Sequence, residues 1–197
     1  MSGARERSGQ ATTVVTTPRL VLRPFTDVDR APFFALNTHP LVVESLGDAP
    51  TRAESDALVD RFIEEMAREG WGPWAVEVAG GTPFVGMVGL HRVNPDLPCA
   101  PAVEAAWRLH PDQWGHGYAT EAAAASFGYG FGRAGLDEII AFTTTHNTRS
   151  QAVMERIGMT RDPAGDFDHP RQPEGSPLRR HVLYRARASQ WRPTVAR

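Results

Sequence analysis

The residues best suited to chemistry form a short turn with two glycines, Trp114-Gly115-His116-Gly117-Tyr118-Ala119-Thr120, between an expected strand and an expected helix. Glycine has no side chain, so a ligand can approach the backbone closely at this turn. The following helix begins with unpaired N–H groups and the positive end of its dipole, which together bind anions. The turn can therefore hold a pyrophosphate without any lysine. It can equally be an ordinary tight turn, and it does not match the G-x-G-x-x-G pattern of dinucleotide-binding folds.

The composition excludes several kinds of catalysis. All 21 basic residues among the 197 are arginine, and the sequence contains no lysine. A Schiff base, a Walker A loop and a protein-kinase ATP site each need a lysine, so none of them is expected. The one cysteine, Cys99, cannot form an intrachain disulfide, an iron–sulfur cluster or a multi-cysteine zinc site. We expect no bound metal.

Charge and hydropathy patterns give three further expectations. The net charge is −2 and no basic run is present, so we expect no nucleic-acid partner. No apolar run approaches the roughly 20 residues of a membrane span, so we expect no membrane partner. The first ten residues are polar and precede no apolar stretch, which predicts that there is no secretory signal and that the protein is cytoplasmic.

The pattern of expected elements predicts one mixed α/β domain over residues 17–188, with a flexible N-terminal tail at 1–16 and a C-terminal tail at 189–197. Thr51 followed by Glu54 is a capping-box pattern that predicts the start of a helix ending at Gly70. Other helices are expected from Asp27 to Leu36, over about 118–133, and over 150–157. Alternating residues predict strands over 19–23, 74–78, 84–90, 102–110, 138–145 and 181–184.

Glu104 is a carboxylate inside the expected strand 102–110, among Val103, Ala105 and Ala106. A carboxylate in that position either lies on a solvated face or is partly buried with a raised pKa. Both interpretations stay open from the sequence.

The segment from Glu104 to Ala122 resembles motif A of the GNAT superfamily, the Gcn5-related N-acetyltransferases, and within it the RimJ/RimL-like branch. Leu109-His110-Pro111 and the stretch from Trp114 to Ala122 match that branch position by position. Trp114 stands where the wider superfamily has Gln or Arg, a departure that is common in the branch. Two more segments resemble it, Thr17-Pro18-Arg19-Leu20-Val21-Leu22-Arg23 and Asn147-Thr148-Arg149-Ser150, so the resemblance covers about residues 17–188.

The resemblance implies the GNAT fold, a mixed and mostly antiparallel central sheet with helices on both faces. The family's fourth and fifth strands, here 102–110 and 138–145, splay apart to admit the pantetheine arm of acetyl-CoA. The implied reaction transfers the acetyl group of acetyl-CoA directly to a primary amine, either a protein N-terminal α-amine or a small molecule. Homodimers are common in the branch.

The resemblance also implies roles for individual residues. Glu104 would be the general base, and Ser150 would protonate the departing thiolate. Asn147 matches a residue that contacts the pantetheine arm of the cofactor. All three residues have another interpretation: Glu104 can be a solvated strand residue, Ser150 an ordinary helix N-cap, and Asn147 a cap or turn residue. The implied cofactor-binding residues are Leu109, His110, Trp114, Gly115, His116, Gly117, Tyr118, Ala119, Thr120, Asn147 and Ser150.

The competing interpretation is a non-catalytic acyl-CoA-binding or regulatory protein on the same scaffold. Cofactor binding and chemistry are separable, so an intact glycine turn does not distinguish the two.

Overall fold

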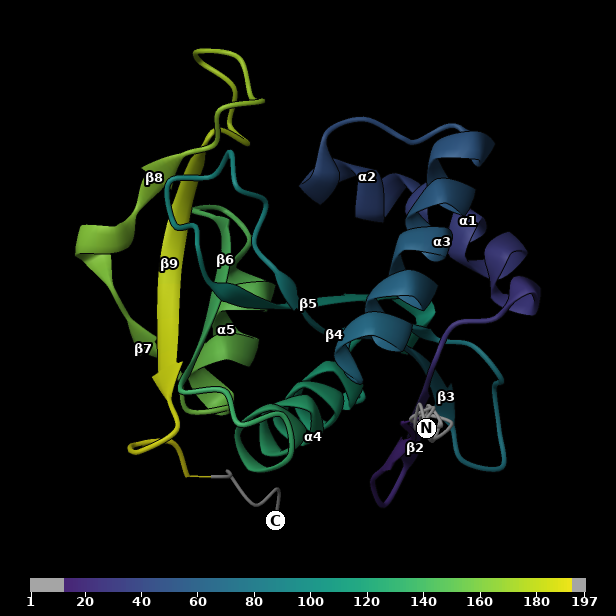
Figure 1. Cartoon of the computed structure of the whole chain (residues 1–197). Helices are drawn as coiled ribbons and strands as arrows, with labels where there is room; N and C mark the ends of the chain where they lie inside the picture. The colour runs from purple at the N-terminus through teal and green to yellow at the C-terminus, as the bar shows by residue number, and fades with distance from the viewer. Residues whose placement is uncertain (1–12, 193–197) are drawn as a thin grey trace, which may run out of the picture.

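One twisted sheet of nine strands organises the protein (Figure 1), and its computed structural model describes residues 13–192. Residues 1–12 and 193–197 lie outside the described part. The strand order is β1-β2-β3-β4-β5-β6-β9-β7, with β8 pairing on β9. Every neighbouring pair is antiparallel except β5 with β6, which confirms the predicted mixed, mostly antiparallel sheet. The strands are β1 (Val15–Thr16), β2 (Leu20–Arg23), β3 (Pro73–Val78), β4 (Gly86–Arg92), β5 (Val103–Leu109), β6 (Glu138–Thr144), β7 (Thr160–Arg161), β8 (Phe167–Asp168) and β9 (Arg180–Arg187).

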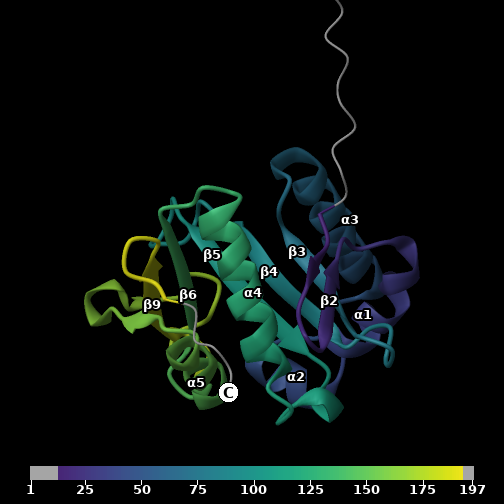
Figure 2. The same cartoon turned by 90° about the horizontal axis from the view of Figure 1, so that it is seen from below.

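Helices cover both faces of this sheet (Figures 1 and 2), as predicted. Alternation along β3 separates the two faces, since neighbouring strand residues point to opposite sides. Trp74 and Val76 pack with α4 and α5, whereas Ala75 packs with the apolar residues of α1, α2 and α3. The helices are α1 (Arg30–Asn37), α2 (Pro40–Leu46), α3 (Arg52–Glu69), α4 (Tyr118–Gly132) and α5 (Thr148–Arg156).

Local signals define helix α3 at both ends. The Thr51 N–H donates to Glu54 Oε2 at 2.8 Å and the Glu54 N–H donates to Thr51 Oγ1 at 3.3 Å, which is the predicted capping box. Gly70 ends the helix with φ +76°, a conformation that glycine adopts at little cost.

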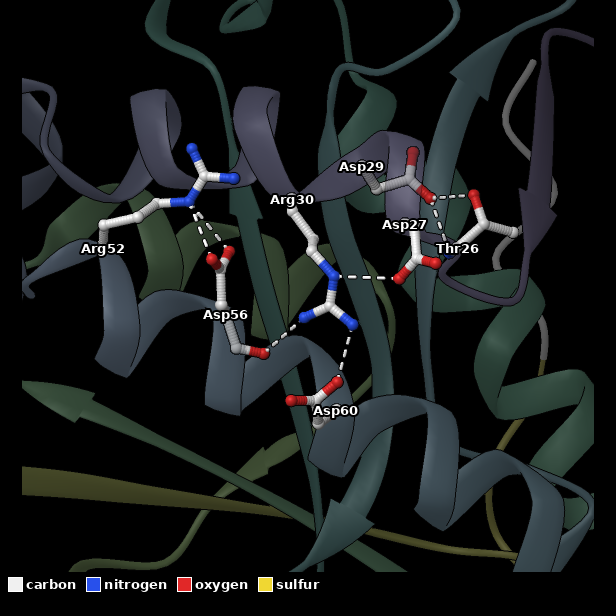
Figure 3. Close-up of polar contacts among 7 residues, drawn as sticks. All are labelled: Thr26, Asp27, Asp29, Arg30, Arg52, Asp56 and Asp60. Atoms are coloured by element: carbon white, nitrogen blue, oxygen red, sulfur yellow. Dashed lines mark hydrogen bonds and ion pairs between the residues drawn. The ribbon is translucent and has the colours of Figure 1, made fainter.

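Arg30 ties α1 to α3 (Figure 3). Its Nη1 donates to the Asp56 carbonyl at 3.0 Å and its Nη2 to Asp60 Oδ1 at 2.6 Å, while Nε reaches Asp27 at 2.9 Å. Beside this cluster, Arg52 pairs with Asp56 one turn along α3, at 2.9 Å. These contacts hold α1 against α3 in the helical layer on this side of the sheet.

The structure revises several predicted boundaries. Helix α2 was not expected; it begins at Pro40 and is capped by His39 Nδ1, which accepts from the Leu41 N–H at 3.2 Å. The predicted N-terminal tail contains β1, which pairs with β2. The predicted C-terminal tail contains Trp191, whose Nε1 donates to the Ile157 carbonyl at 2.7 Å. Among the described residues, no helix is long and apolar enough to cross a bilayer.

Two glycine substitutions test this packing. A Cβ at Gly89 of β4 would lie 2.6 Å from Pro73 Cα, so we expect Gly89→Ala to destabilise the protein by about 2 kcal/mol. Gly128 of α4 has no neighbour within 4 Å of that position, so Gly128→Ala should stabilise by about 0.5–1 kcal/mol. Urea unfolding of both variants measures the two changes, and an equal effect of both would contradict the packing described.

Candidate active site

Strands β5 and β6 part from one another inside the sheet. They pair in register only at Glu104 with Ile140. Beyond that point β5 continues along β4 as far as Leu109, and β6 continues along β9 as far as Thr144. Because the two strands are parallel, their carboxyl ends lie at one edge of the sheet, from which the chain continues toward α4 and α5 (Figure 2). The predicted splay of these strands is therefore present, and the glycine turn follows one of them.

The turn after β5 presents a series of free backbone amides. In the described part of the chain, none of the N–H groups of residues 115–120 donates a hydrogen bond; the first paired amide is that of Glu121, which donates to Gly117 at 3.0 Å. Gly115 and Gly117 both have positive φ, +82° and +79°. Six unpaired amides in a turn that leads into a helix are donors able to bind an anion.

Arg19 and Thr17, which precede β2, bind this turn through hydrogen bonds. Arg19 Nη1 donates to the His116 carbonyl at 2.9 Å, and Arg19 Nε donates to Glu121 Oε2 at 2.6 Å. The Thr17 hydroxyl donates to Glu121 Oε1 at 2.6 Å. Burial alone would raise the pKa of Glu121, but these hydrogen bonds keep that pKa below its usual range. The sequence interpretation placed Arg19 in a matching segment without giving it this role.

Aromatic contacts fix the rest of the turn. The Trp114 Nε1 donates to the Leu109 carbonyl at 2.8 Å, and the Arg149 guanidinium lies 4.7 Å from the centre of the Trp114 ring. His116 and Tyr118 stack with ring centres 5.5 Å apart. The His110 side chain caps the short turn after β5 by accepting from the Asp112 N–H at 3.4 Å. Ala119 and Thr120 follow in the first turn of α4.

Glu104 is largely buried at the point where β5 and β6 meet. Its side chain is 12% exposed, and His91 Nε2 on β4 lies 3.5 Å from its Oε2. Desolvation raises the pKa of Glu104 to about 7, although His91 lowers it in part. The structure thus supports the second sequence interpretation, a partly buried carboxylate with a raised pKa. Such a group exchanges protons near neutral pH, as a general base must.

Asn147, rather than Ser150, caps helix α5. Asn147 Oδ1 accepts from the Ser150 N–H at 3.1 Å, and the helix begins at Thr148. The N-cap interpretation of Ser150 is therefore wrong, because the helix begins at Thr148 and Ser150 lies inside its first turn. The Ser150 hydroxyl makes no hydrogen bond within residues 13–192, so it is free to contact a ligand.

Arg108 and Asn37 were not singled out from the sequence. Arg108 lies on the same face of β5 as Glu104 and donates through Nη1 to Asn37 Oδ1 at the end of α1. The alternation of Glu104, Ala106 and Arg108 along one strand was the available signal. No group of three or more His, Cys, Asp or Glu side chains is arranged to hold a metal in residues 13–192.

The family model described as "Acetyltransferase (GNAT) domain" matches residues 19–160, which include the parting strands, the amide turn and Glu104. The chain belongs to this GNAT acetyltransferase family. The Bacillus subtilis protein named "Uncharacterized N-acetyltransferase YnaD" is 42% identical over 149 residues, which are 75% of this chain and 83% of that protein. The FsC-acetyl coenzyme A-N(2)-transacetylase of Aspergillus fumigatus is 34% identical over 151 residues, 73% of this chain and 63% of that protein.

A solved GNAT structure has the same fold. RimL, a ribosomal L7/L12 alpha-N-protein acetyltransferase in complex with coenzyme A, superposes with a TM-score of 0.73. The superposition covers 89% of this chain and 98% of RimL at 15% identity, so the likeness extends to the fold alone.

Proposed function

We propose that the protein is an N-acetyltransferase of the RimJ/RimL-like branch that transfers the acetyl group of acetyl-CoA to a primary amine. The observation that carries the proposal is the position of Glu104, a largely buried carboxyl group with a pKa near 7 at the junction of β5 and β6. The acceptor would be a protein N-terminal α-amine or a small-molecule amine. Both the transacetylase and RimL carry names that describe transfer to an amino nitrogen.

The residues at the parting strands suit acetyl-CoA. The unpaired amides of residues 115–120 would hold its pyrophosphate, with Arg19 and Glu121 keeping the turn in place. The unpaired inner edges of β5 and β6 would receive the pantetheine arm beside Leu109. Asn147 and Ser150 stand at the start of α5, on the other side of that opening.

The proposed chemistry removes two protons from the ammonium nitrogen, delivers one to the CoA sulfur and forms no covalent enzyme intermediate. A protonated amine cannot attack, so Glu104 would take a proton from the amine directly or through one water. A bond then forms between the amine nitrogen and the acetyl carbon, and the bond from that carbon to the CoA sulfur breaks. The Ser150 hydroxyl would give a proton to the departing thiolate and regain one, directly or through a water, from the second proton that the nitrogen loses as the amide forms. The proton on Glu104 would pass to solvent.

The amide turn gives a binding prediction. Replacement of Gly117 by alanine strains a residue at φ +79° and places a Cβ 3.4 Å from Arg19 Nη2. We expect Gly117→Ala to raise the KM for acetyl-CoA about tenfold, since about 1–2 kcal/mol of strain falls on the turn itself. Gly70→Ala is the matched control, because Gly70 has φ +76° at the far end of α3 and should lose stability but keep its KM. An equal rise in the KM for acetyl-CoA in both variants would show that the turn does not bind the cofactor.

Glu104 gives a prediction about pH. Only the deprotonated carboxylate accepts a proton, and the pKa of Glu104 is about 7, so kcat/KM should rise with pH through 7 and then level off. Glu104→Gln should lose this rise and about 100-fold or more of kcat/KM. The measurement is release of free CoA from acetyl-CoA with a panel of amines between pH 5.5 and 9. Titration of the amine itself appears in both proteins and so does not confuse the comparison.

Two outcomes would count against the proposal in different ways. An unchanged pH profile in Glu104→Gln would exclude Glu104 as the base. If acetyl-CoA raised the Tm but no amine released CoA, the chain would be a non-catalytic acyl-CoA-binding protein.

A further inference from the structure

Arg108 places a positive charge on the face of β5 that also carries Glu104. In the described residues, Arg108 makes one hydrogen bond, from Nη1 to Asn37 Oδ1, and it forms no ion pair. The pKa of Arg108 is lowered to about 10 by burial, so the guanidinium remains charged at neutral pH. A desolvated charge without a counter-ion is costly, and an anion would offset that cost.

Arg23 shows how this protein neutralises a comparable arginine. Arg23 lies on β2 and pairs with Asp29 at 2.7 Å and also with Glu77. These carboxylates raise its pKa above the ordinary value, the reverse of the direction at Arg108. Within residues 13–192, two carboxylates thus face Arg23 and none faces Arg108 at ion-pair distance.

Asn37 orients Arg108 without neutralising it. Asn37 is 1% exposed at the end of α1, and its Nδ2 donates to Ser55 Oγ on α3 at 3.3 Å. This bond leaves the Asn37 oxygen for the guanidinium and so fixes which way the amide faces. Nε and Nη2 of Arg108 have no partner in the described residues, and neither is among the fully buried unpaired side-chain atoms there. Two N–H donors of the guanidinium edge therefore remain accessible.

We propose that Arg108 binds a carboxylate carried by the acceptor, so that the acceptor is an amine that also bears a carboxylate, as an amino acid does. The inference rests on the proposed acetyl transfer, and it narrows the acceptor class. Arg108 and Glu104 are four residues apart on one strand face, which separates their Cα atoms by roughly 13 Å. Their side chains and a small acceptor fill that span, with the carboxylate at Arg108 and the amine toward Glu104. A guanidinium matches a carboxylate in shape and charge.

Contacts between the two halves of the protein favour a small acceptor. Gly47, at the end of α2, has its Cβ position 3.3 Å from Leu178 Cδ1 and 3.5 Å from Gln172 Nε2, both in the segment between β8 and β9. The same segment approaches the loop before β5 through Arg171 and Asp96, 3.9 Å apart. These approaches place the end of α2 beside the β8–β9 segment. A polypeptide acceptor would need more space there than a small molecule does.

A series of matched amines on the wild-type protein tests the proposal without any substitution. For glycine, leucine and phenylalanine, each amino acid is compared with its amide and with the decarboxylated amine. The amide has the size of the amino acid but no negative charge. Its amine is also less basic, so a larger fraction of it is unprotonated at a given pH. A faster reaction of the acid therefore cannot be explained by a larger supply of unprotonated amine. We expect kcat/KM for CoA release to favour the acid over its amide by about 30-fold or more in at least one set.

Substitutions then assign the preference to Arg108. Arg108→Gln should abolish the preference for the acid while keeping the KM for acetyl-CoA, and Arg108→Lys should retain part of it. Arg187→Gln, which removes an exposed charge on β9, should leave the preference unchanged. Circular dichroism and Tm confirm that the variants are folded.

The outcomes separate the two proposals. If amines are acetylated but acid and amide react equally, or the preference survives in Arg108→Gln, the role of Arg108 is overturned and the acetyltransferase activity stands. If no amine releases CoA from acetyl-CoA, the proposed function itself is overturned, together with this choice of acceptor.

Discussion

A single pairing point between two parallel strands determines how the site is built. Strands β5 and β6 meet at Glu104 and Ile140 and then follow different neighbours, β4 and β9. Each strand keeps a full antiparallel partner on its outer side, so the sheet tolerates unpaired backbone groups between them. Because β5 and β6 are parallel, the start of α4 and the start of α5 lie at one edge of the sheet, and Glu104 lies where the two strands part.

Burial changes the pKa of both charged groups on this face of β5. It raises the pKa of Glu104 and lowers the pKa of Arg108, and each shift favours the neutral form. Among residues 13–192, Glu104 faces no arginine at ion-pair distance and Arg108 faces no carboxylate. Glu104 lies 3.5 Å from His91, and Arg108 donates to the Asn37 amide oxygen. By contrast, Arg23 and Arg30, which tie framework elements together, both face carboxylates. Perturbed groups without structural partners are typical of functional sites.

The parts that depend on neighbouring residues could be predicted from the sequence. The capping box at Thr51, the glycine end of α3 and the glycine turn before α4 each arise within a few residues, and all three are present. The choice of Asn147 over Ser150 as the cap of α5 depended on a three-residue shift that the pattern does not resolve. The tether from Arg19 to Glu121 and the bond from Arg108 to Asn37 join residues 102 and 71 positions apart. Such contacts follow from the folded sheet, and no local pattern encodes them.

Glu104 should exchange its proton near neutral pH. Carbon-13 NMR of protein labelled at the glutamate side-chain carboxyl measures this directly, and the missing resonance in Glu104→Gln assigns the signal. The structure predicts a titration midpoint near the pKa of about 7 that burial produces. A midpoint near the ordinary value of 4.5 would show that Glu104 is solvated and would remove the physical basis for its role as a base.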